Sequence, residues 1–219
     1  MLRSVNRKWS KWLPYAFLVL AALSRWPELF PPSFSVMYAL MFCAGVYFSR
    51  AVVWWLPLAT LVVTDIGLDL YYQYYRGWDV FDPAHLKNQL LVYAAYLLII
   101  VLGRRFKPQS SFLALLGGGI LGAVLFYLIT NTASWFFNPF GSPEYTKTLQ
   151  GWLRALTVGT SGWPQTWEFF RNTLMSGGLF TGLFVGAMKL TEAAESAREK
   201  ETEEEEEPEG EEAPEPRDA

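Results

Sequence analysis

The stretch Phe112–Trp135, FLALLGGGILGAVLFYLITNTASW, decides the fold class of this chain. It carries no charged residue, and as an α-helix at ~1.5 Å per residue it extends about 36 Å, more than the ~30 Å hydrocarbon core of a bilayer. Five more apolar stretches, each flanked by polar residues, occur in the 219-residue sequence. They are Leu13–Leu29, Phe34–Phe48, Val52–Tyr72, Leu90–Leu102 and Phe169–Leu190. The sequence therefore predicts an all-α membrane protein that forms a six-transmembrane-helix bundle.

Composition divides the chain into two parts. Residues 1–190 hold the apolar stretches and are predicted to form the six-helix membrane domain. Residues 191–219 are almost purely polar, contain the run Glu203–Glu207 and hold most of the acidic side chains. This composition predicts an acidic, disordered cytoplasmic tail. No small-x-small cleavage site follows Ala22, so an uncleaved first span is expected in place of a signal peptide.

The basic residues predict the orientation of the six spans. Four groups of Lys and Arg fall on the same side of such a bundle, and the positive-inside rule assigns that side to the cytoplasm. The groups are Arg3, Arg7, Lys8 and Lys11; Arg50; Arg104, Arg105 and Lys107; and Lys189, Arg198 and Lys200. We therefore expect a multi-pass protein of the inner (plasma) membrane with both termini in the cytoplasm.

Two helix starts are expected in the outer loops. Asp82 followed by Pro83 is typical of an N-cap and a first helical turn, which indicates where the fourth span begins. After Ser142 and Pro143, apolar residues recur at the spacing i, i+3, i+4, i+7. These residues are Leu149, Trp152, Leu153 and Leu156. They predict a short interfacial helix between spans five and six, which either lies at the outer membrane surface or folds back as a lid.

Polar residues inside the spans identify a candidate site. A charge within a transmembrane segment costs about 2.5–3.5 kcal/mol on insertion, so it usually faces a cavity or a partner. Asp65 and Asp69 are four residues apart and share one helix face, while Asn131, Arg171 and Asn172 are expected at the same outer depth. Two interpretations stay open: a polar substrate pocket open to the outside, or an inert network in which Arg171 pairs with one of the aspartates.

The sequence contains no recognisable catalytic or metal-binding motif. A Gly-x-Ser-x-Gly elbow, a His-Glu-x-x-His pair and a Walker loop are all missing, and the single histidine, His85, lies in a predicted loop. Cys43 stands alone within an apolar stretch and is expected to be a buried thiol. Two aspartates without His or Cys suit a hard cation or a protonated amine. We therefore expect no enzyme, no catalytic residue, no resident metal and no cofactor.

Several segments resemble an uncharacterised family of bacterial integral membrane proteins. That family shows Asn-x-x-x-Trp, Tyr-Pro-Lys-Thr-x-x-Gly and Phe-Phe-Arg-Asn-Thr-Leu in this order, and a Ser-Asp in the third span. The counterparts here are Asn131–Trp135 (NTASW), Tyr145–Gly151 (YTKTLQG), Phe169–Leu174 (FFRNTL) and Thr64–Asp65. The chain departs from the family at Ser33 and Val36, where Asn and Pro are usual.

This family in turn is similar to the substrate-binding membrane subunits, or S components, of energy-coupling-factor vitamin transporters. The resemblance implies six helices with both termini inside and a vitamin site near the outer face. It also implies docking on a transmembrane coupling subunit with two ATPases.

The leading hypothesis is a substrate-binding subunit that takes up a small vitamin-like solute from outside, with the lipid bilayer as its other partner and no role for nucleic acid. The expected substrate-binding residues are Asp65, Asp69, Asn131, Trp135, Tyr145, Lys147, Trp163, Arg171 and Asn172. The charged and amide groups would orient the solute and the aromatic rings would stack on it. Two alternatives are a structural or assembly protein with aromatic outer loops, and a stand-alone ion-coupled carrier that uses Asp65 and Asp69.

Overall fold

The computed structural model of the chain describes residues 8–206. Over this range the structure is helical and contains no strand. The elements are α1 (Lys8–Leu23), α2 (Met37–Tyr47), α3 (Leu56–Tyr71), the π-helical turn η1 (Tyr72–Arg76), α4 (Pro83–Gly103), α5 (Phe112–Phe137), α6 (Leu149–Thr157) and α7 (Thr166–Glu206). Within this part of the chain, three helices are long and apolar enough to cross a membrane: α4, α5 and the segment Thr166–Thr202 of α7. The all-α, membrane-protein-like architecture predicted from the sequence is confirmed.

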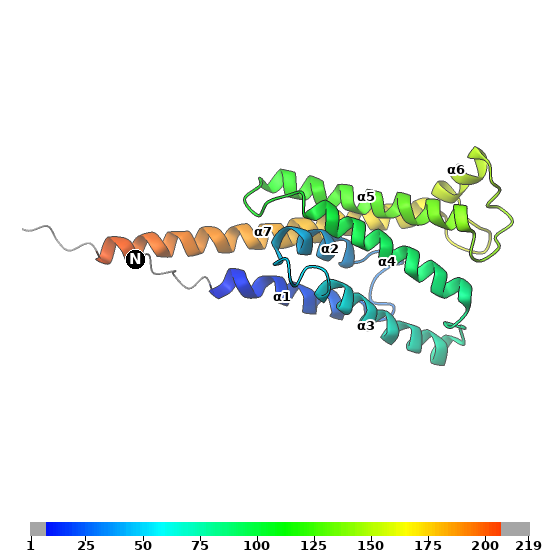
Figure 1. The fold of residues 1–219 in the computed structure, drawn as a ribbon, viewed down its shortest axis with the longest axis horizontal. Coiled ribbons are helices and arrows are strands. Elements are labelled where there is room, and N and C mark those ends of the chain that lie inside the picture. The colour runs from blue at the N-terminus through cyan, green and yellow to red at the C-terminus, as the bar shows by residue number, and fades with distance from the viewer. Residues whose placement is uncertain (1–7, 207–219) are drawn as a thin grey trace, which may run out of the picture.

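Helix α2 is the centre of the bundle. All its residues from Met37 to Val46 are buried, and it packs against α1, α3, α4, α5 and α7. Figure 1 shows α5 and α7 on one side of the molecule and α1 and α3 on the other, with α2 and α4 between them. A helix covered on every side has no polar face, and the sequence MYALMFCAGVY has none. Cys43 lies in this helix and is buried, as expected.

Two glycines bring α2 and α4 into direct contact. A Cβ atom added to Gly45 would lie 2.8 Å from the Cα of Gly103, and one added to Gly103 would meet the carbonyl oxygen of Phe42. Because Tyr38 packs near Tyr96 at one end and Gly45 meets Gly103 at the other, the two helices run in parallel. Such close approach of backbones requires residues without side chains.

Small residues also line the contact between α5 and α7. A Cβ atom added to Gly178 would lie 3.5 Å from Ile120 Cγ1, and one added to Gly182 would lie 3.6 Å from Leu116 Cδ1. Rising residue numbers in α7 meet falling numbers in α5, so these helices are antiparallel. Helices α4 and α5 are antiparallel as well. Gly122 lies next to Ile99, and one turn earlier in α4 Tyr96 packs on Phe126, which is one turn later in α5.

The predicted short helix between spans five and six is present as α6. Thr148 caps it by accepting a hydrogen bond from the backbone N–H of Gly151 at 3.1 Å. Trp152 holds it on α5, because its indole N–H donates to Thr132 Oγ1 at 3.0 Å. Leu149 and Leu153 remain 69% and 48% exposed. The apolar face of α6 is therefore only partly covered, which suits a position at a membrane surface.

Helix α4 begins where the sequence predicts, and α7 continues further than the sequence predicts. α4 begins at Pro83, and Asp82 caps it by accepting from the N–H of Ala84 at 2.6 Å, as expected. α7 continues to Glu206, although a disordered tail was expected from residue 191. Glu, Ala, Lys and Arg all favour helices, and α7 already supplies the nucleus, so the helix propagates at little cost. The rest of the expected tail, residues 207–219, lies outside the described residues.

The α2–α4 contact makes a stability prediction with an internal control. Gly103→Ala should destabilise the protein by about 1–3 kcal/mol, because the added methyl group meets the backbone of α2. Gly117→Ala should leave stability unchanged or raise it, since a Cβ at Gly117 finds open space and alanine favours the helix. Thermal unfolding of both variants in the same detergent measures the difference. Equal melting temperatures would contradict the close packing of α2 on α4.

Candidate functional site

A cavity of about 500 Å³ lies between α4, α5, the start of α7 and the connection 138–165. We call it the roofed cavity and the connection the roof, because seven of the twelve lining residues come from this connection. Four aromatic residues line it: Phe140, Tyr145, Trp163 and Phe169. Besides the hydroxyl of Tyr145, the polar side chains of the lining are two amides and four aliphatic hydroxyls, from Asn88, Asn131, Ser134, Ser142, Thr160 and Thr166. A cavity that combines aromatic rings with a few polar groups suits a small organic molecule.

The hydroxyl of Tyr127 connects three helices, α5, α6 and α7, next to the roofed cavity. Its hydroxyl on α5 donates to the carbonyl oxygen of Leu156 at the end of α6, at 2.5 Å, and lies 3.3 Å from the carbonyl oxygen of Thr166. Gly159 makes the turn between α6 and α7 possible, because its φ of +78° is in the left-handed region. A Cβ at Gly159 would also collide with the hydroxyl of Thr166, which lines the cavity.

Asn138 shapes the first turn of the roof. It ends α5 in the left-handed conformation, with φ of 40°, which asparagine tolerates better than most residues. Its side-chain oxygen accepts from the N–H of Ser142 at 2.8 Å, and its side-chain nitrogen donates to the carbonyl of Ser142 at 2.9 Å. These two bonds close the turn that carries Phe140 and Ser142 to the cavity.

Glu144 ties the two ends of the roof together. Its carboxylate accepts a hydrogen bond from the backbone N–H of Ser161 at 3.0 Å. Hydrogen bonding from Ser161 lowers the pKa of the Glu144 carboxyl below its ordinary value. The ionised form of Glu144 therefore holds Thr160 and Trp163 close to Tyr145.

Two of the predicted substrate-binding residues, Trp135 and Lys147, do not line the roofed cavity. Their contacts connect the roof to α5 instead. The indole N–H of Trp135 donates to the carbonyl of Thr146 at 2.7 Å. The ammonium of Lys147 donates to the carbonyls of Trp135, at 2.6 Å, and of Phe136, and lies 5.3 Å from the centre of the Trp135 ring. A cation at the last carbonyls of α5 stabilises the negative end of that helix. Lys147 thereby anchors the roof to α5.

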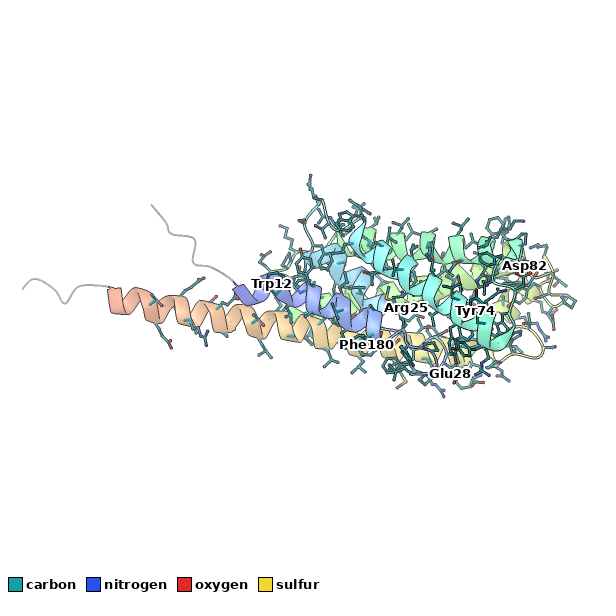
Figure 2. All side chains as sticks on the ribbon, turned by 90° about the horizontal axis from the view of Figure 1, so that it is seen from below. Trp12, Arg25, Glu28, Tyr74, Asp82 and Phe180 are labelled. Atoms are coloured by element: carbon teal, nitrogen blue, oxygen red, sulfur yellow. The ribbon has the colours of Figure 1, made fainter. Side chains whose placement is uncertain are left out.

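The two aspartates lie in a separate polar cluster between α1, α3 and α4. Asp65 forms an ion pair with Arg25, which follows the end of α1 (Figure 2). Asp69 accepts a long hydrogen bond from the side-chain nitrogen of Gln89 at 3.4 Å, and its other oxygen lies 3.4 Å from His85 Nε2. The cationic partner of Asp65 is thus Arg25, and neither aspartate pairs with Arg171 as the network interpretation supposed.

A second ion pair ties the loop after α1 to the same side of the molecule. Glu28 in this loop pairs with Arg76 in η1. Figure 2 shows Arg25 and Glu28 between Trp12, near the start of α1, and Tyr74 in η1. Together the two ion pairs hold the loop against α3 and η1.

Arg171 and Asn172 lie on α7 but do not line the roofed cavity. The guanidinium of Arg171 lies 5.5 Å from the centre of the Trp167 ring. The side-chain nitrogen of Asn172 donates to the carbonyl of Pro32 at 2.9 Å and so joins α7 to the loop before α2. Of the nine predicted residues, the structure brings together Asn131, Tyr145 and Trp163. The convergence of Asp65, Asn131 and Arg171 at one site is not observed.

Sequence reasoning missed several residues of the roofed cavity. Asn88 is in the second turn of α4, and the predicted topology placed the beginning of that helix at the same depth as Asn131. That signal was sufficient to find it. Phe140, Thr160 and Thr166 carry no such signal, because their positions depend on the turns at Asn138 and Gly159. In the described part of the chain, no group of three or more His, Cys, Asp or Glu side chains could hold a metal ion.

The geometry defines a helical, membrane-protein-like chain with a roofed cavity of the size that suits a small organic molecule. A family of unknown function (DUF6580) matches residues 5–200, and the chain belongs to this family. No curated protein and no solved structure matches it significantly. The expected membership of an uncharacterised family is confirmed. The likeness of that family to S components gains no support from these comparisons and stays a prediction.

The contact between Glu144 and Ser161 predicts a pH-dependent roof. A carboxyl whose pKa is lowered by folding contributes stability above its unfolded pKa, and this contribution disappears as the pH falls through the folded value. Hydrogen–deuterium exchange of residues 138–165, corrected for the intrinsic pH dependence of exchange, should therefore accelerate below the ordinary pKa of glutamate. Glu144→Gln should show the faster exchange at neutral pH as well. Glu168→Gln is the matched control, and an equal effect of both variants would contradict the role of Glu144.

The ion pair between Arg25 and Asp65 predicts a rescue experiment. Arg25→Gln leaves the carboxylate of Asp65, which is only 13% exposed, without its cation. We expect a loss of stability below the ~3–5 kcal/mol that breaking a fully buried pair costs. The double variant Arg25→Gln/Asp65→Asn should regain part of this loss, because no uncompensated charge remains. Thermal unfolding in detergent measures the unaltered protein, Arg25→Gln, Asp65→Asn and the double variant, and additive losses would contradict the pairing.

Proposed function

We propose that this protein is a membrane-embedded substrate-binding subunit of an energy-coupling-factor-type uptake transporter. In this proposal it is a binding protein and not an enzyme, and it captures a small, vitamin-like solute at the outer face of the plasma membrane. The observation that carries the proposal is the roofed cavity of about 500 Å³ between α4, α5 and α7. Its volume falls in the range of about 300–1,000 Å³ typical of small-molecule sites.

The arrangement of the helices supports a topology in which this cavity opens outward. α2 and α4 are parallel, and α5 is antiparallel to both α4 and α7, as six alternating spans require. α1 begins and α7 ends toward the same end of the molecule, opposite the roof (Figure 1). The basic residues Arg104, Arg105 and Lys107 follow the end of α4 at that end. The positive-inside rule then favours cytoplasmic termini and an external cavity.

The lining of the roofed cavity suits capture more than chemistry. Aromatic rings bind flat solutes by stacking, and the amides of Asn88 and Asn131 offer hydrogen bonds that fix the orientation. The roof is fixed at several points, by Tyr127, Asn138, Glu144 and Lys147, so little conformational freedom has to be lost when a ligand binds. Such preorganisation favours tight capture from a dilute external medium.

The ion-coupled carrier alternative receives less support. A carrier of this kind needs a carboxylate that exchanges its cation during each cycle. The charge of Asp65 is already balanced by Arg25, which is itself part of the chain and cannot leave. Of the two aspartates, this leaves only Asp69, which contacts Gln89 and His85, for such an exchange.

The proposal predicts that ligand binding depends on Trp163 and not on Trp167. Purified protein should bind at least one member of a vitamin panel in isothermal titration calorimetry. Trp163→Ala should weaken that binding by about tenfold or more, the equivalent of ~1.4 kcal/mol, because the ring lines the cavity. Trp167→Ala should not, since Trp167 lies outside the lining and contacts Arg171.

Binding and partner capture are separate observations. Absence of binding across the whole panel would overturn the capture function. Binding without any ATPase that copurifies would keep the capture function and overturn the assignment to an energy-coupling-factor assembly.

A further inference from the structure

We infer that the roofed cavity selects an uncharged ring compound whose edge carries an amide-like pair of one donor and one acceptor. The inference rests on the proposed function and concerns the substrate class of the same site. It follows from the charges around the cavity, from the free hydrogen-bonding groups in it, and from the position of its aromatic rings.

No charged residue lines the roofed cavity within the described residues. The roof, residues 138–165, contains three charged residues, and the side chain of each contacts the backbone of the protein. Lys147 donates to the last carbonyls of α5, Glu144 accepts from the N–H of Ser161, and Arg154 donates through Nε to the carbonyl of Gly159 at 3.2 Å. These charges stabilise the roof and are not directed to a ligand.

A charged ligand would therefore find no counter-charge in the cavity. Removing an ion from water is costly unless an opposite charge or several strong hydrogen bonds replace the lost hydration. The seven polar side chains of the lining, Tyr145 included, carry neutral amides and hydroxyls. They can replace the hydration of a neutral polar edge, but they supply no opposite charge.

The two amides define the hydrogen-bonding edge. Asn131 uses one N–H of its side-chain nitrogen to donate to the carbonyl of Tyr127 at 2.8 Å, which leaves its oxygen and its second N–H for a ligand in the cavity that it lines. The side chain of Asn88 makes no hydrogen bond within the described residues, so its amide presents one donor group and one acceptor group. An amide pairs best with another amide-like edge, because the donor of each group then bonds to the acceptor of the other.

The aromatic residues add the preference for a ring. Trp163 and Phe140 are 65% and 61% exposed, although both line the cavity. Tyr145 and Phe169, the other two aromatic residues of the lining, are half-buried. A flat ring that enters the cavity would cover the two exposed side chains, and the area buried favours binding.

Matched pairs of ligands test the charge preference. The full-length protein is titrated by calorimetry with nicotinamide and nicotinate, and with riboflavin and riboflavin 5′-phosphate. In each pair the ring is the same. Riboflavin 5′-phosphate adds a charged group and leaves the ring edge unchanged, whereas nicotinate carries a carboxylate in place of the amide and so loses the N–H donor as well. We expect the uncharged member of at least one pair to bind, and its charged counterpart to bind at least about tenfold more weakly.

The edge is tested with a third ligand and two variants. If nicotinamide binds, 3-acetylpyridine is titrated as well, because it keeps the ring and the carbonyl but lacks the N–H donor of the amide. We expect 3-acetylpyridine to bind more weakly than nicotinamide. Asn88→Asp, which removes the donor and adds a negative charge, should weaken the uncharged ligand. Lys87→Gln changes an exposed neighbour outside the lining and should leave binding unchanged. Unchanged melting temperatures of both variants show that they fold.

The outcomes separate this inference from the proposed function. Equal or tighter binding of the charged members would overturn the inference and leave the capture function intact. The inference is also overturned, and the capture function kept, if a charged member of the vitamin panel binds and loses its binding in Trp163→Ala. Absence of binding by every compound would overturn the proposed function and the inference together.

Discussion

The burial of α2 is the constraint on which the rest of the structure depends. This helix is short, it is covered on all sides, and its contact with α4 is so close that neither Gly45 nor Gly103 has room for a side chain. The other helices are arranged around it, and α4 in turn positions α5. The walls of the roofed cavity, which come from α4, α5 and α7, therefore depend on a contact between two glycines far from the cavity itself.

The polar residues of the chain have separate structural tasks. Arg25 and Asp65, and Glu28 and Arg76, hold the first loop on α3 and η1. Lys147, Glu144 and Arg154 fix the roof through backbone groups. This division leaves neutral side chains to line the cavity. It also explains why charge within a predicted span was a poor guide to the ligand site, since the costliest charges are paired with each other.

The sequence predicted the helical elements well because apolar length and helix caps are local signals. Asp82 and Pro83 indicated the start of α4, and the spacing of Trp152 and Leu156 indicated α6. It predicted the site only in part, because depth in a bundle does not determine which helix faces meet. Asp65 and Asn131 share a predicted depth, yet α3 packs on α1 and α2 whereas α5 packs on α4 and α7. Contacts of that kind are set by packing across the whole bundle.

The unbroken length of α7 gives the molecule a mechanical lever. Its first turns supply Thr166 and Phe169 to the cavity, and the same helix continues for 41 residues to an acidic end that projects beyond the other helices (Figure 1). At ~1.5 Å per residue it is a rod of about 60 Å, and an α-helix is stiff along its axis. A tilt of the projecting end is therefore transmitted along the helix to the cavity wall at the opposite end of the bundle, without any contact at the cavity.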